Sequence, residues 1–247
     1  MDNPYMVKPH LDGEPFTYQG NKTGFLLVHG FTATTTEIRP LAERLHALEY
    51  TVKAPLLPGH GTHPDELNKT KWQDWYGEVK QAYLELVEVC DQVWLGGESM
   101  GALLSLRVAA EFPDVAGLML FSPALVVPNL KWAYLLQFFQ KHLDKSQKED
   151  DLAWKGYNVY PLKGAVQLRK LQKIVRRDLS RVTQPVMGVV SEADETVDLS
   201  TGQLIIDSVS STHKRLLVMK ESPHTMLLGA EKEKIIDEAI AFFKSVS

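Results

Sequence analysis

The sequence predicts an α/β fold in which helices flank a mostly parallel central sheet, with a helical insertion before the last strands. Three observations carry this prediction. Short runs that are apolar nearly throughout recur along the chain, helical patterns fill most intervals between them, and a Gly-x-Ser-x-Gly motif joins one such run to a helical one. With 247 residues the chain can bury a large core, so one domain with an insertion is expected.

Six runs have the length and composition of strands buried on both faces. Such strands are apolar nearly throughout, because helices cover both sides of a parallel sheet. The runs are GFLLVHG (24–30), YTVKAP (50–55), QVWLGG (92–97), GLMLFSP (117–123), VMGVVS (186–191) and KRLLVMK (214–220). Amphipathic helical stripes are found in segments 36–49, 72–89 and 233–246. This alternation of strand and helix predicts a parallel sheet.

Residues 126–177 interrupt the alternation and contain no clear strand. Stretches such as LKWAYLLQFFQKHL and LKGAVQLRKLQKIVRR are helix-like, so we interpret 126–177 as a helical insertion (the insertion) in a core formed by 1–125 and 178–247. Its aromatic residues suit a cap over an apolar cleft, although helices packed on the sheet would have the same composition. These aromatic residues are Trp132, Tyr134, Phe138, Phe139, Trp154, Tyr157 and Tyr160.

The composition excludes several classes of partner. A net charge of −4 offers no overall basic surface for nucleic acid or an anionic membrane. No run approaches ~18 apolar residues, so stable membrane insertion is not expected. The first residues, MDNPYMVKPHLDGEPF, do not resemble a signal peptide, and the single cysteine, Cys90, cannot form an internal disulfide. We expect a cytoplasmic protein with a small-molecule partner, and leave a homodimer open.

The motif Gly97-Glu98-Ser99-Met100-Gly101 lies between a strand-like run and a helical one. A sharp strand-to-helix turn brings backbone segments into contact, so it needs small residues two positions before and after the serine. Such a turn lifts the serine hydroxyl above the sheet and directs a helix N-terminus toward it. The bare motif is only moderately specific, and its place in the alternation is what predicts Ser99 as a nucleophile.

Serine is a weak nucleophile unless a histidine takes its proton and a carboxylate orients that histidine. In strand–turn–helix enzymes the chain order is serine, acid, histidine. His224 follows the run 214–220, at the end where the active groups of open α/β sheets gather. His213 precedes that run, at the opposite end of the sheet, and is expected at the surface. We therefore predict His224 as the base.

The orienting acid should follow the run 186–191, in the loop SEADETVD. Asp194 has the reach that a short loop allows, and we predict it as the acid. Asp198 is the alternative, although its late position would also let it cap a following helix. A calcium site in this loop is disfavoured, because the loop lacks the spaced Asp/Asn ligands and the glycine of an EF-hand.

Two backbone amides are expected to bind the oxyanion that forms during acyl transfer. The Met100 amide comes directly after the nucleophile. The Phe31 amide lies in the turn His29-Gly30-Phe31, at the end of the first buried run. Because His29 precedes Ser99 in the chain, we expect it to support this turn rather than act as the base.

His60 and His63 have the H-x-x-H spacing of some metal ligands. No cysteine pair or carboxylate cluster accompanies them, so shaping of the loop PGHGTH is the favoured interpretation over metal binding. We predict no metal and no cofactor.

Six segments together resemble the bacterial carboxylesterase and monoacylglycerol lipase family of the α/β hydrolases. They are LLVHGFTAT, EIRPLAERL, YTVKAPLLPGHGTHPDEL, GGESMGALLSL, SEADETV and SPHTMLL, and the match covers nearly the whole chain, being weakest over 126–180. The resemblance implies an α/β-hydrolase fold in which Ser99 is the nucleophile, Asp194 the acid and His224 the base. It assigns the oxyanion amides to Phe31 and Met100, and implies that the insertion is the family's cap.

The expected activity is hydrolysis of carboxylic esters with apolar, short- to medium-length acyl chains, including monoacylglycerols, through a Ser-His-Asp acyl-enzyme. Three polar residues of the insertion, Tyr157, Asn158 and Lys163, would hold a small alcohol or else lie on a solvated outer face. A thioesterase or amidase with the same triad is the alternative. A non-catalytic binding protein is disfavoured because all three triad residues are present, and dehalogenase chemistry because it uses aspartate in place of Ser99.

Overall fold

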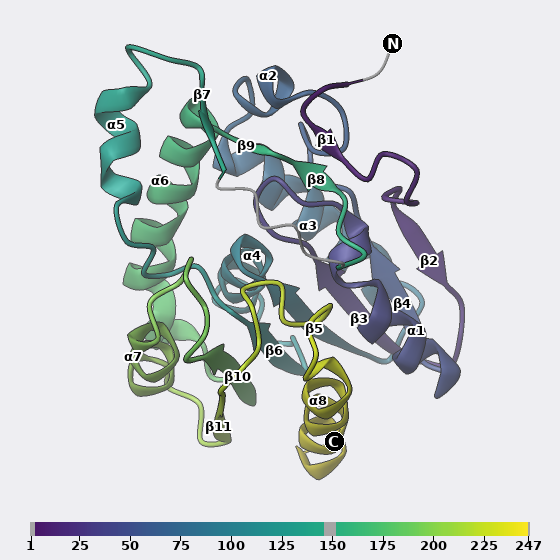
Figure 1. The fold of residues 1–247 in the computed structure, drawn as a ribbon. Coiled ribbons are helices and arrows are strands. Elements are labelled where there is room, and N and C mark those ends of the chain that lie inside the picture. The colour runs from purple at the N-terminus through teal and green to yellow at the C-terminus, as the bar shows by residue number, and fades with distance from the viewer. Residues whose placement is uncertain (1–2, 146–151, 247) are drawn as a thin grey trace.

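A seven-stranded sheet forms the centre of the molecule in a computed structural model, which describes residues 3–145 and 152–246 (Figure 1). The strands of this sheet are β2 Phe16–Tyr18, β3 Thr23–Val28, β4 Thr51–Ala54, β5 Gln92–Glu98, β6 Gly117–Phe121, β10 Val186–Ser191 and β11 Lys214–Met219. Their order across the sheet is β11-β10-β6-β5-β3-β4-β2. β2 runs antiparallel to β4, and all other neighbours are parallel.

Each of the six apolar runs overlaps one of these strands, with ends that differ by at most two residues. β6 and β10 are buried at every position, because helices cover both of their faces. β2 is not predicted by the sequence, since its three residues are too few to establish a period. The predicted mostly parallel sheet is confirmed, with one antiparallel strand added at its edge.

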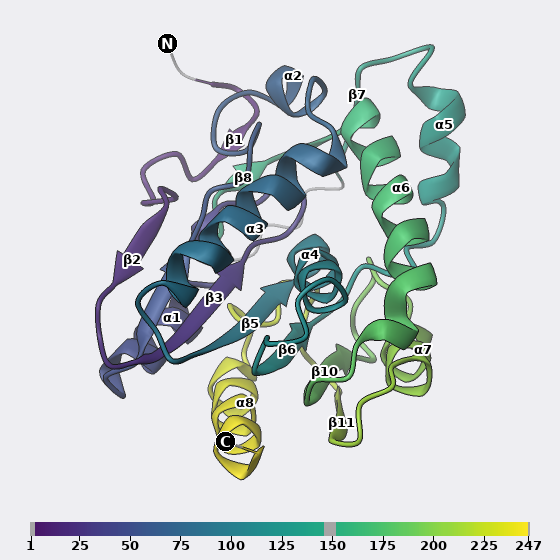
Figure 2. The same cartoon turned by 180° about the vertical axis from the view of Figure 1, so that it is seen from behind.

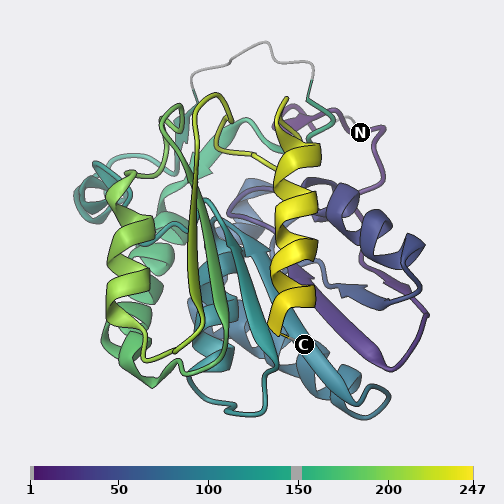
Figure 3. The same cartoon turned by 90° about the horizontal axis from the view of Figure 1, so that it is seen from below.

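Helices cover the sheet on both faces. The core helices are α1 Arg39–Ala47, α2 Pro64–Leu67, α3 Trp72–Val87, α4 Met100–Ala109, α7 Ser200–Ser208 and α8 Lys232–Val246, with 3-10 turns η1 Thr35–Glu37 and η3 Leu179–Arg181. Figure 2 shows α3 and α4 in front of the strands, and Figure 3 shows α8, in yellow, along the opposite face. Two buried clusters fill these interfaces: one holds Trp75 and Leu103, the other Trp94 and Phe243, whose ring centroids are 5.2 Å apart.

Between β6 and β10 the chain forms a separate set of elements, several short ones and one long helix, in the upper and middle part of the view in Figure 1. They are η2 Leu130–Trp132, α5 Ala133–Leu136, β7 His142–Asp144, β8 Gly156–Tyr157, β9 Val159–Pro161 and α6 Leu162–Asp178. β7 pairs with β9, while β8 pairs with β1 (Met6–Val7) near the N-terminus. Residues 146–151 of the insertion lie outside the described residues.

The expectation that the insertion contains no strand is wrong. The long helix α6 is confirmed, and it continues one residue past the expected boundary at Arg177. The helix-like pattern over 130–143, in contrast, yields only η2 and the four-residue α5, because pairing with β9 holds His142–Asp144 extended. Tertiary pairing here outweighs local helix propensity.

Several aromatic residues of the insertion face solvent rather than a cleft. Trp132 is 52% exposed, and Phe138 and Phe139 are each 79% exposed. Tyr157, in contrast, is fully buried. The aromatic cluster therefore does not act as one inward-facing set. In the part of the chain that the structure describes, no helix is both long and apolar enough to cross a membrane.

Candidate active site

Ser99 lies in the turn between β5 and α4, at the carboxyl end of the parallel strands. Its backbone has φ 57° and ψ −113°, a conformation that residues other than glycine rarely adopt. The Ser99 amide donates to the Phe121 carbonyl at the end of β6, at 2.9 Å. The turn therefore lifts Ser99 out of the strand while a bond to the neighbouring strand holds it in place.

Gly97 and Gly101 make this turn sterically possible. A Cβ at Gly97 would lie 2.4 Å from the Gly101 carbonyl carbon, and a Cβ at Gly101 would lie 2.0 Å from the Val28 carbonyl oxygen. Both distances are far shorter than any van der Waals contact, so only glycine fits at either position. The predicted need for small residues on both sides of Ser99 is confirmed.

His224 bridges Ser99 and Asp194. Its Nε2 lies 3.0 Å from Ser99 Oγ, and its Nδ1 lies 2.8 Å from Asp194 Oδ2. His224 follows β11 and Asp194 follows β10, so their loops leave the same end of the sheet as Ser99. The Asp194 side chain is 3% exposed and that of His224 22% exposed, so the acid is enclosed while the imidazole stays accessible. The structure thus brings the three predicted residues together.

Asp194 is held as a carboxylate by its hydrogen bonds. Burial alone would raise its pKa, but the bond and charge of His224, with the Val197 and Thr196 amides, outweigh burial and hold the pKa of Asp194 below its ordinary value. The two amides donate to Oδ1, at 2.8 Å from Thr196 and 3.0 Å from Val197, which leaves Oδ2 for His224. An ionised Asp194 can accept the Nδ1 proton of His224 and so leave Nε2 unprotonated toward Ser99.

Asp198 and His213, the alternatives for the acid and the base, lie away from Ser99, His224 and Asp194. Asp198 is exposed, and its Oδ1 accepts the Ser200 amide at 2.9 Å at the start of α7, which is the capping role considered from the sequence. His213 is exposed just before β11, at the opposite end of the sheet. Among the described residues, neither side chain bonds to Ser99 or His224.

Phe31 lies in residues 29–32, which follow β3 and are here called the oxyanion loop after the role expected for the Phe31 amide. The Phe31 N–H and the Gly30 carbonyl belong to the same peptide group. This group is held by its carbonyl, which lies 2.9 Å from His29 Nδ1 and accepts the Ala33 amide at 3.3 Å. Met100 begins α4 directly after Ser99. Within residues 3–145 and 152–246, neither the Phe31 nor the Met100 amide donates a hydrogen bond, so both can serve a ligand oxygen.

His29 supports the oxyanion loop, as expected from its position in the chain. It is fully buried, and its Nε2 accepts the Leu57 amide at 3.1 Å while Nδ1 faces the Gly30 carbonyl. Burial lowers the pKa of His29 to about 4. A neutral ring with its proton on Nδ1 satisfies both contacts, so His29 is a structural residue of the loop.

His60 and His63 also shape their loop. His60 is buried, and burial places its pKa well below the ordinary value, while its Nδ1 lies 3.2 Å from the Pro58 carbonyl. His63 precedes α2 and accepts the Asp65 amide at 3.1 Å. Of the residues that the structure describes, no three His, Cys, Asp or Glu side chains are placed to hold a metal ion.

Two buried glutamates beside the site are not predicted by the sequence. Glu37 Oε2 accepts the Gly30 amide at 2.6 Å, and Glu98 Oε1 accepts the Leu227 amide at 3.3 Å. Burial raises the pKa of both, and the charge of Glu37 raises that of Glu98 further, to well above its ordinary value. Of the two carboxyls, Glu98 is therefore the one whose neutral form burial and the neighbouring charge favour more strongly.

Glu98→Gln tests this neutral state through stability. In the unfolded chain Glu98 loses its proton in the ordinary glutamate range, whereas the folded protein keeps the proton to higher pH. Folding thus takes up a proton between these two pKa values, and stability falls as pH rises through that window. We expect Glu98→Gln to reduce this slope, by up to about 1.4 kcal/mol per pH unit. Urea unfolding between pH 5 and 8 measures it.

Glu98→Ala serves as the control for loss of volume. It removes the same titration but leaves a cavity, so it should lower the free energy of unfolding at every pH. An unchanged slope in Glu98→Gln would show that Glu98 is ionised in the folded protein.

The polar residues considered for an alcohol pocket make other contacts. The Tyr157 hydroxyl donates to the Gly59 carbonyl at 2.7 Å and accepts the Thr62 amide at 3.0 Å. Asn158 Nδ2 donates to a backbone carbonyl near the N-terminus, and Lys163 is exposed. Tyr157 therefore does not lie on a solvated face, and its hydroxyl anchors the insertion to the loop at 59–62.

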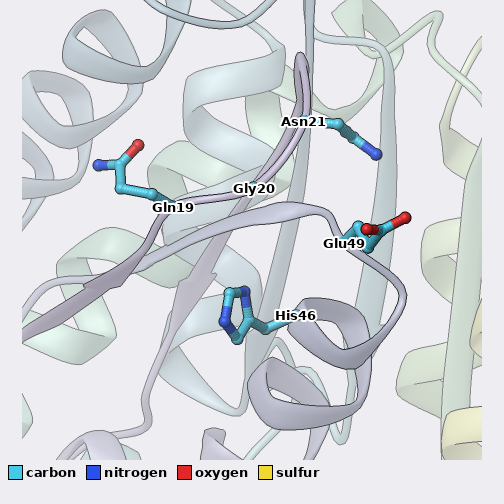
Figure 4. A pocket seen from close by; sticks show the side chains of 5 residues that line it. All are labelled: Gln19, Gly20, Asn21, His46 and Glu49. Carbon is cyan, nitrogen blue, oxygen red and sulfur yellow. The ribbon is translucent and has the colours of Figure 1, made fainter.

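A surface depression of about 420 Å³ lies far from Ser99. Its lining residues are Gln19, Gly20, Asn21, His46 and Glu49. These residues precede β3 and β4, at the end of the sheet opposite Ser99. Figure 4 shows their side chains spread apart rather than converging on one point. The depression is a gap between turns and takes no part in the site.

The sheet, its covering helices and the turn at Ser99 are those of an α/β hydrolase. The family model described as serine aminopeptidase, S33, matches residues 20–155, more than half of the chain. The chain belongs to this family of serine hydrolases.

Two curated relatives indicate which kind of serine hydrolase the chain resembles. A thermostable monoacylglycerol lipase of Bacillus sp. (strain H-257) is 32% identical over 95% of this chain and 96% of its own. A carboxylesterase of Bacillus subtilis (strain 168) is 26% identical over 94% and 97%. The resemblance to bacterial carboxylesterases and monoacylglycerol lipases is thereby confirmed, and with it the class of enzyme.

Solved structures agree with this placement. A structure described with the metagenome-derived lipolytic enzymes LipS and LipT is 31% identical, has a TM-score of 0.90, and covers 94% of this chain and 98% of its own. A monoacylglycerol lipase from Paleococcus ferrophilus, 18% identical with a TM-score of 0.78, covers 96% of this chain and all of its own. The latter supports the fold alone.

Proposed function

We propose that this chain hydrolyses carboxylic esters of apolar acyl chains through a covalent acyl-enzyme on Ser99. The observation that carries the proposal is the continuous contact from Ser99 Oγ through His224 to the buried Asp194 carboxylate, with distances of 3.0 and 2.8 Å. This geometry meets the requirement that nucleophile, base and orienting acid lie within hydrogen-bond reach of one another.

In the first half-reaction Ser99 Oγ attacks the ester carbonyl carbon as its proton passes to His224 Nε2. The carbon–oxygen bond to the alcohol then breaks, and His224 returns that proton to the leaving alcohol. In the second half-reaction water attacks the acyl-enzyme, His224 takes the water proton, and Ser99 leaves with it as the acid is released. Asp194 stays ionised and stabilises the imidazolium in both halves.

The oxyanion of each tetrahedral intermediate would bind the Phe31 and Met100 amides. Both belong to rigid structure, since Met100 starts α4 and the oxyanion loop is held by His29 and Glu37. Such preorganised donors stabilise charge that develops only in the transition state. Because they are backbone groups, changes to the Phe31 or Met100 side chain would disturb them less than loss of a side-chain donor would.

We further propose that residues 126–177 act as a cap on a core formed by 1–125 and 178–247. The contact of α6 with the site supports this role, since a Cβ at Gly164 would lie 3.1 Å from the Phe31 ring. Phe31 also meets Trp75 edge to face, with centroids 6.0 Å apart. The surface beside the oxyanion loop is apolar, so it would bind an apolar acyl chain in preference to a charged substrate group.

Substrate class is tested by comparing esters with their analogues. We expect the highest kcat/KM for p-nitrophenyl esters of short to medium acyl chains and measurable turnover of monoacylglycerols, the substrate named for the Bacillus sp. relative. Matched anilides and acyl-CoA thioesters should be poorer substrates. A higher kcat/KM for a thioester or anilide would instead favour the thioesterase or amidase alternative with the same triad.

We also propose a cytoplasmic location, supported by Cys90. This cysteine is buried and free, which suits a reducing compartment. A homodimer stays a prediction from the sequence.

A further inference from the structure

Lys145 connects the insertion to the oxyanion loop. It follows β7, and its amide donates to the Asn158 carbonyl at 3.0 Å, which fixes the start of its side chain. The side chain runs toward the core, where Nζ donates to Thr32 Oγ1 at 2.6 Å. On the way it lies over the rings of Trp154 and Tyr160, with Nζ 4.6 and 4.9 Å from their centroids. Such rings favour a cation at this position.

Thr32 connects Lys145 to Phe31 through its hydroxyl group. Its hydroxyl accepts from Lys145 and donates to the Phe31 carbonyl at 2.5 Å. Thr32 has φ 68°, an unusual conformation for a β-branched residue, and the Tyr157 amide holds its carbonyl at 2.8 Å. Two residues of the insertion, Lys145 and Tyr157, therefore hold Thr32, whose hydroxyl in turn bonds the Phe31 carbonyl.

Glu37 holds the other side of the same loop. Its Oε2 accepts the Gly30 amide at 2.6 Å, and its Oε1 lies 3.4 Å from Trp154 Nε1, the indole that also faces Lys145. Burial lowers the pKa of Lys145 to about 7, and the Glu37 charge acts in the opposite direction. Lys145 and Glu37 thus compensate each other's charge in a place partly shielded from water, where an unpaired charge would lower the stability of the folded protein.

We propose that Lys145 is a positioning residue, which together with Glu37 clamps the oxyanion loop from both sides and so sets the direction of the Phe31 amide. The inference rests on the proposed function, because it assigns Lys145 a role in that reaction. The amide binds only the tetrahedral oxyanion, so loosening it removes transition-state stabilisation and leaves ground-state binding intact.

Lys145→Met tests the clamp, because it keeps the length of the stem and removes the ammonium. We expect kcat for a p-nitrophenyl ester to fall about 10- to 100-fold with KM changed less than about twofold, as a small displacement of a catalytic group produces. Affinity for a trifluoromethyl ketone, which forms a tetrahedral adduct, should fall by the same factor as kcat/KM. A merely structural defect would not separate kcat from KM in this way.

A double-mutant cycle connects the effect to Thr32. Thr32→Val keeps the branched shape and removes the hydroxyl, so it should reproduce the loss of kcat, and combining it with Lys145→Met should add little. Additive losses would overturn the proposal, because they would mean that the two residues act separately. If Lys145→Met does not fold, Thr32→Val alone carries the test, and unchanged kcat in it would overturn the proposal.

Lys155→Met is the matched control. Lys155 also joins the insertion to the core, but its Nζ donates to the Leu11 carbonyl at 2.7 Å, away from the oxyanion loop. We expect kcat to stay at the wild-type value. An equal loss in Lys155→Met, or wild-type kcat in Lys145→Met, would overturn the role of Lys145 while ester hydrolysis by the wild type stands. Absence of ester hydrolysis in the wild type would instead overturn the proposed function.

Discussion

Ser99→Ala is expected to lower ester turnover by about 10⁶-fold and to leave the fold intact. Alanine removes the oxygen that lies 3.0 Å from His224 Nε2 and that would form the acyl bond. It keeps the Ser99 amide, which bonds to the Phe121 carbonyl, and it tolerates the positive φ no worse than serine does. Initial rates with a p-nitrophenyl ester and a thermal unfolding curve measure the two parts of this expectation.

Ser105→Ala is the control for Ser99→Ala. Ser105 lies on α4 close to the turn, is fully buried, and its hydroxyl donates to the Gly101 carbonyl at 3.0 Å. A fluorophosphonate should label the wild type and Ser105→Ala with one adduct per chain and leave Ser99→Ala unlabelled. Turnover or labelling retained in Ser99→Ala would place the nucleophile elsewhere.

The parts of the fold that the sequence predicts are those whose physical cause is local. β6 and β10 are recognisable because a strand covered on both faces must be apolar at every position. Ser99, Asp194 and His224 are recognisable because each follows a short apolar run, and thus a predicted strand, at the same end of the sheet, although the last of these strands, β11, is a partly exposed edge strand. Their order in the chain then limits the choice, and the structure brings them within hydrogen-bond reach.

The buried charges could not be predicted in the same way. Glu37 and Glu98 are buried and Lys145 is partly buried, although these residue types usually lie at the surface, and this burial depends on contacts between distant segments. For Glu98 a signal exists, since it continues the buried strand β5 up to Ser99 and must share that burial. Glu37 has the pattern of an ordinary acidic residue at a helix start, and Lys145 belongs to a polar stretch. No local sequence feature therefore predicts the burial of either residue.

The insertion shows a second limit of periodicity. An aromatic residue in a helical pattern indicates an apolar stripe, but not which side of the element meets the core. Phe138 and Phe139 face solvent, whereas Tyr157 is buried against the loop at 59–62. The local pattern does not show this difference, which depends on tertiary contacts: Tyr157 lies in β8, which pairs with β1, whereas Phe138 and Phe139 lie between α5 and β7.

Asp194→Asn is expected to lower kcat by about 10⁴-fold, whereas Asp198→Asn should retain nearly wild-type turnover. Asp198 is exposed and serves the start of α7, so its charge contributes to the helix terminus rather than to His224. Measuring kcat for both variants on one ester, with circular dichroism for the fold, distinguishes the two carboxylates. A severe loss in Asp198→Asn with mild loss in Asp194→Asn would transfer the role of acid to Asp198.

The hydrogen bonds around Asp194 explain why so small a change should be so severe. The Thr196 and Val197 amides both donate to Oδ1, so the introduced amide group keeps its oxygen on that side. Its NH₂ must then face His224 Nδ1, which becomes the acceptor and moves the imidazole proton to Nε2. A protonated Nε2 cannot take the proton of Ser99. The loss should therefore appear in kcat and in the rate of fluorophosphonate labelling, while substrate binding and stability change little.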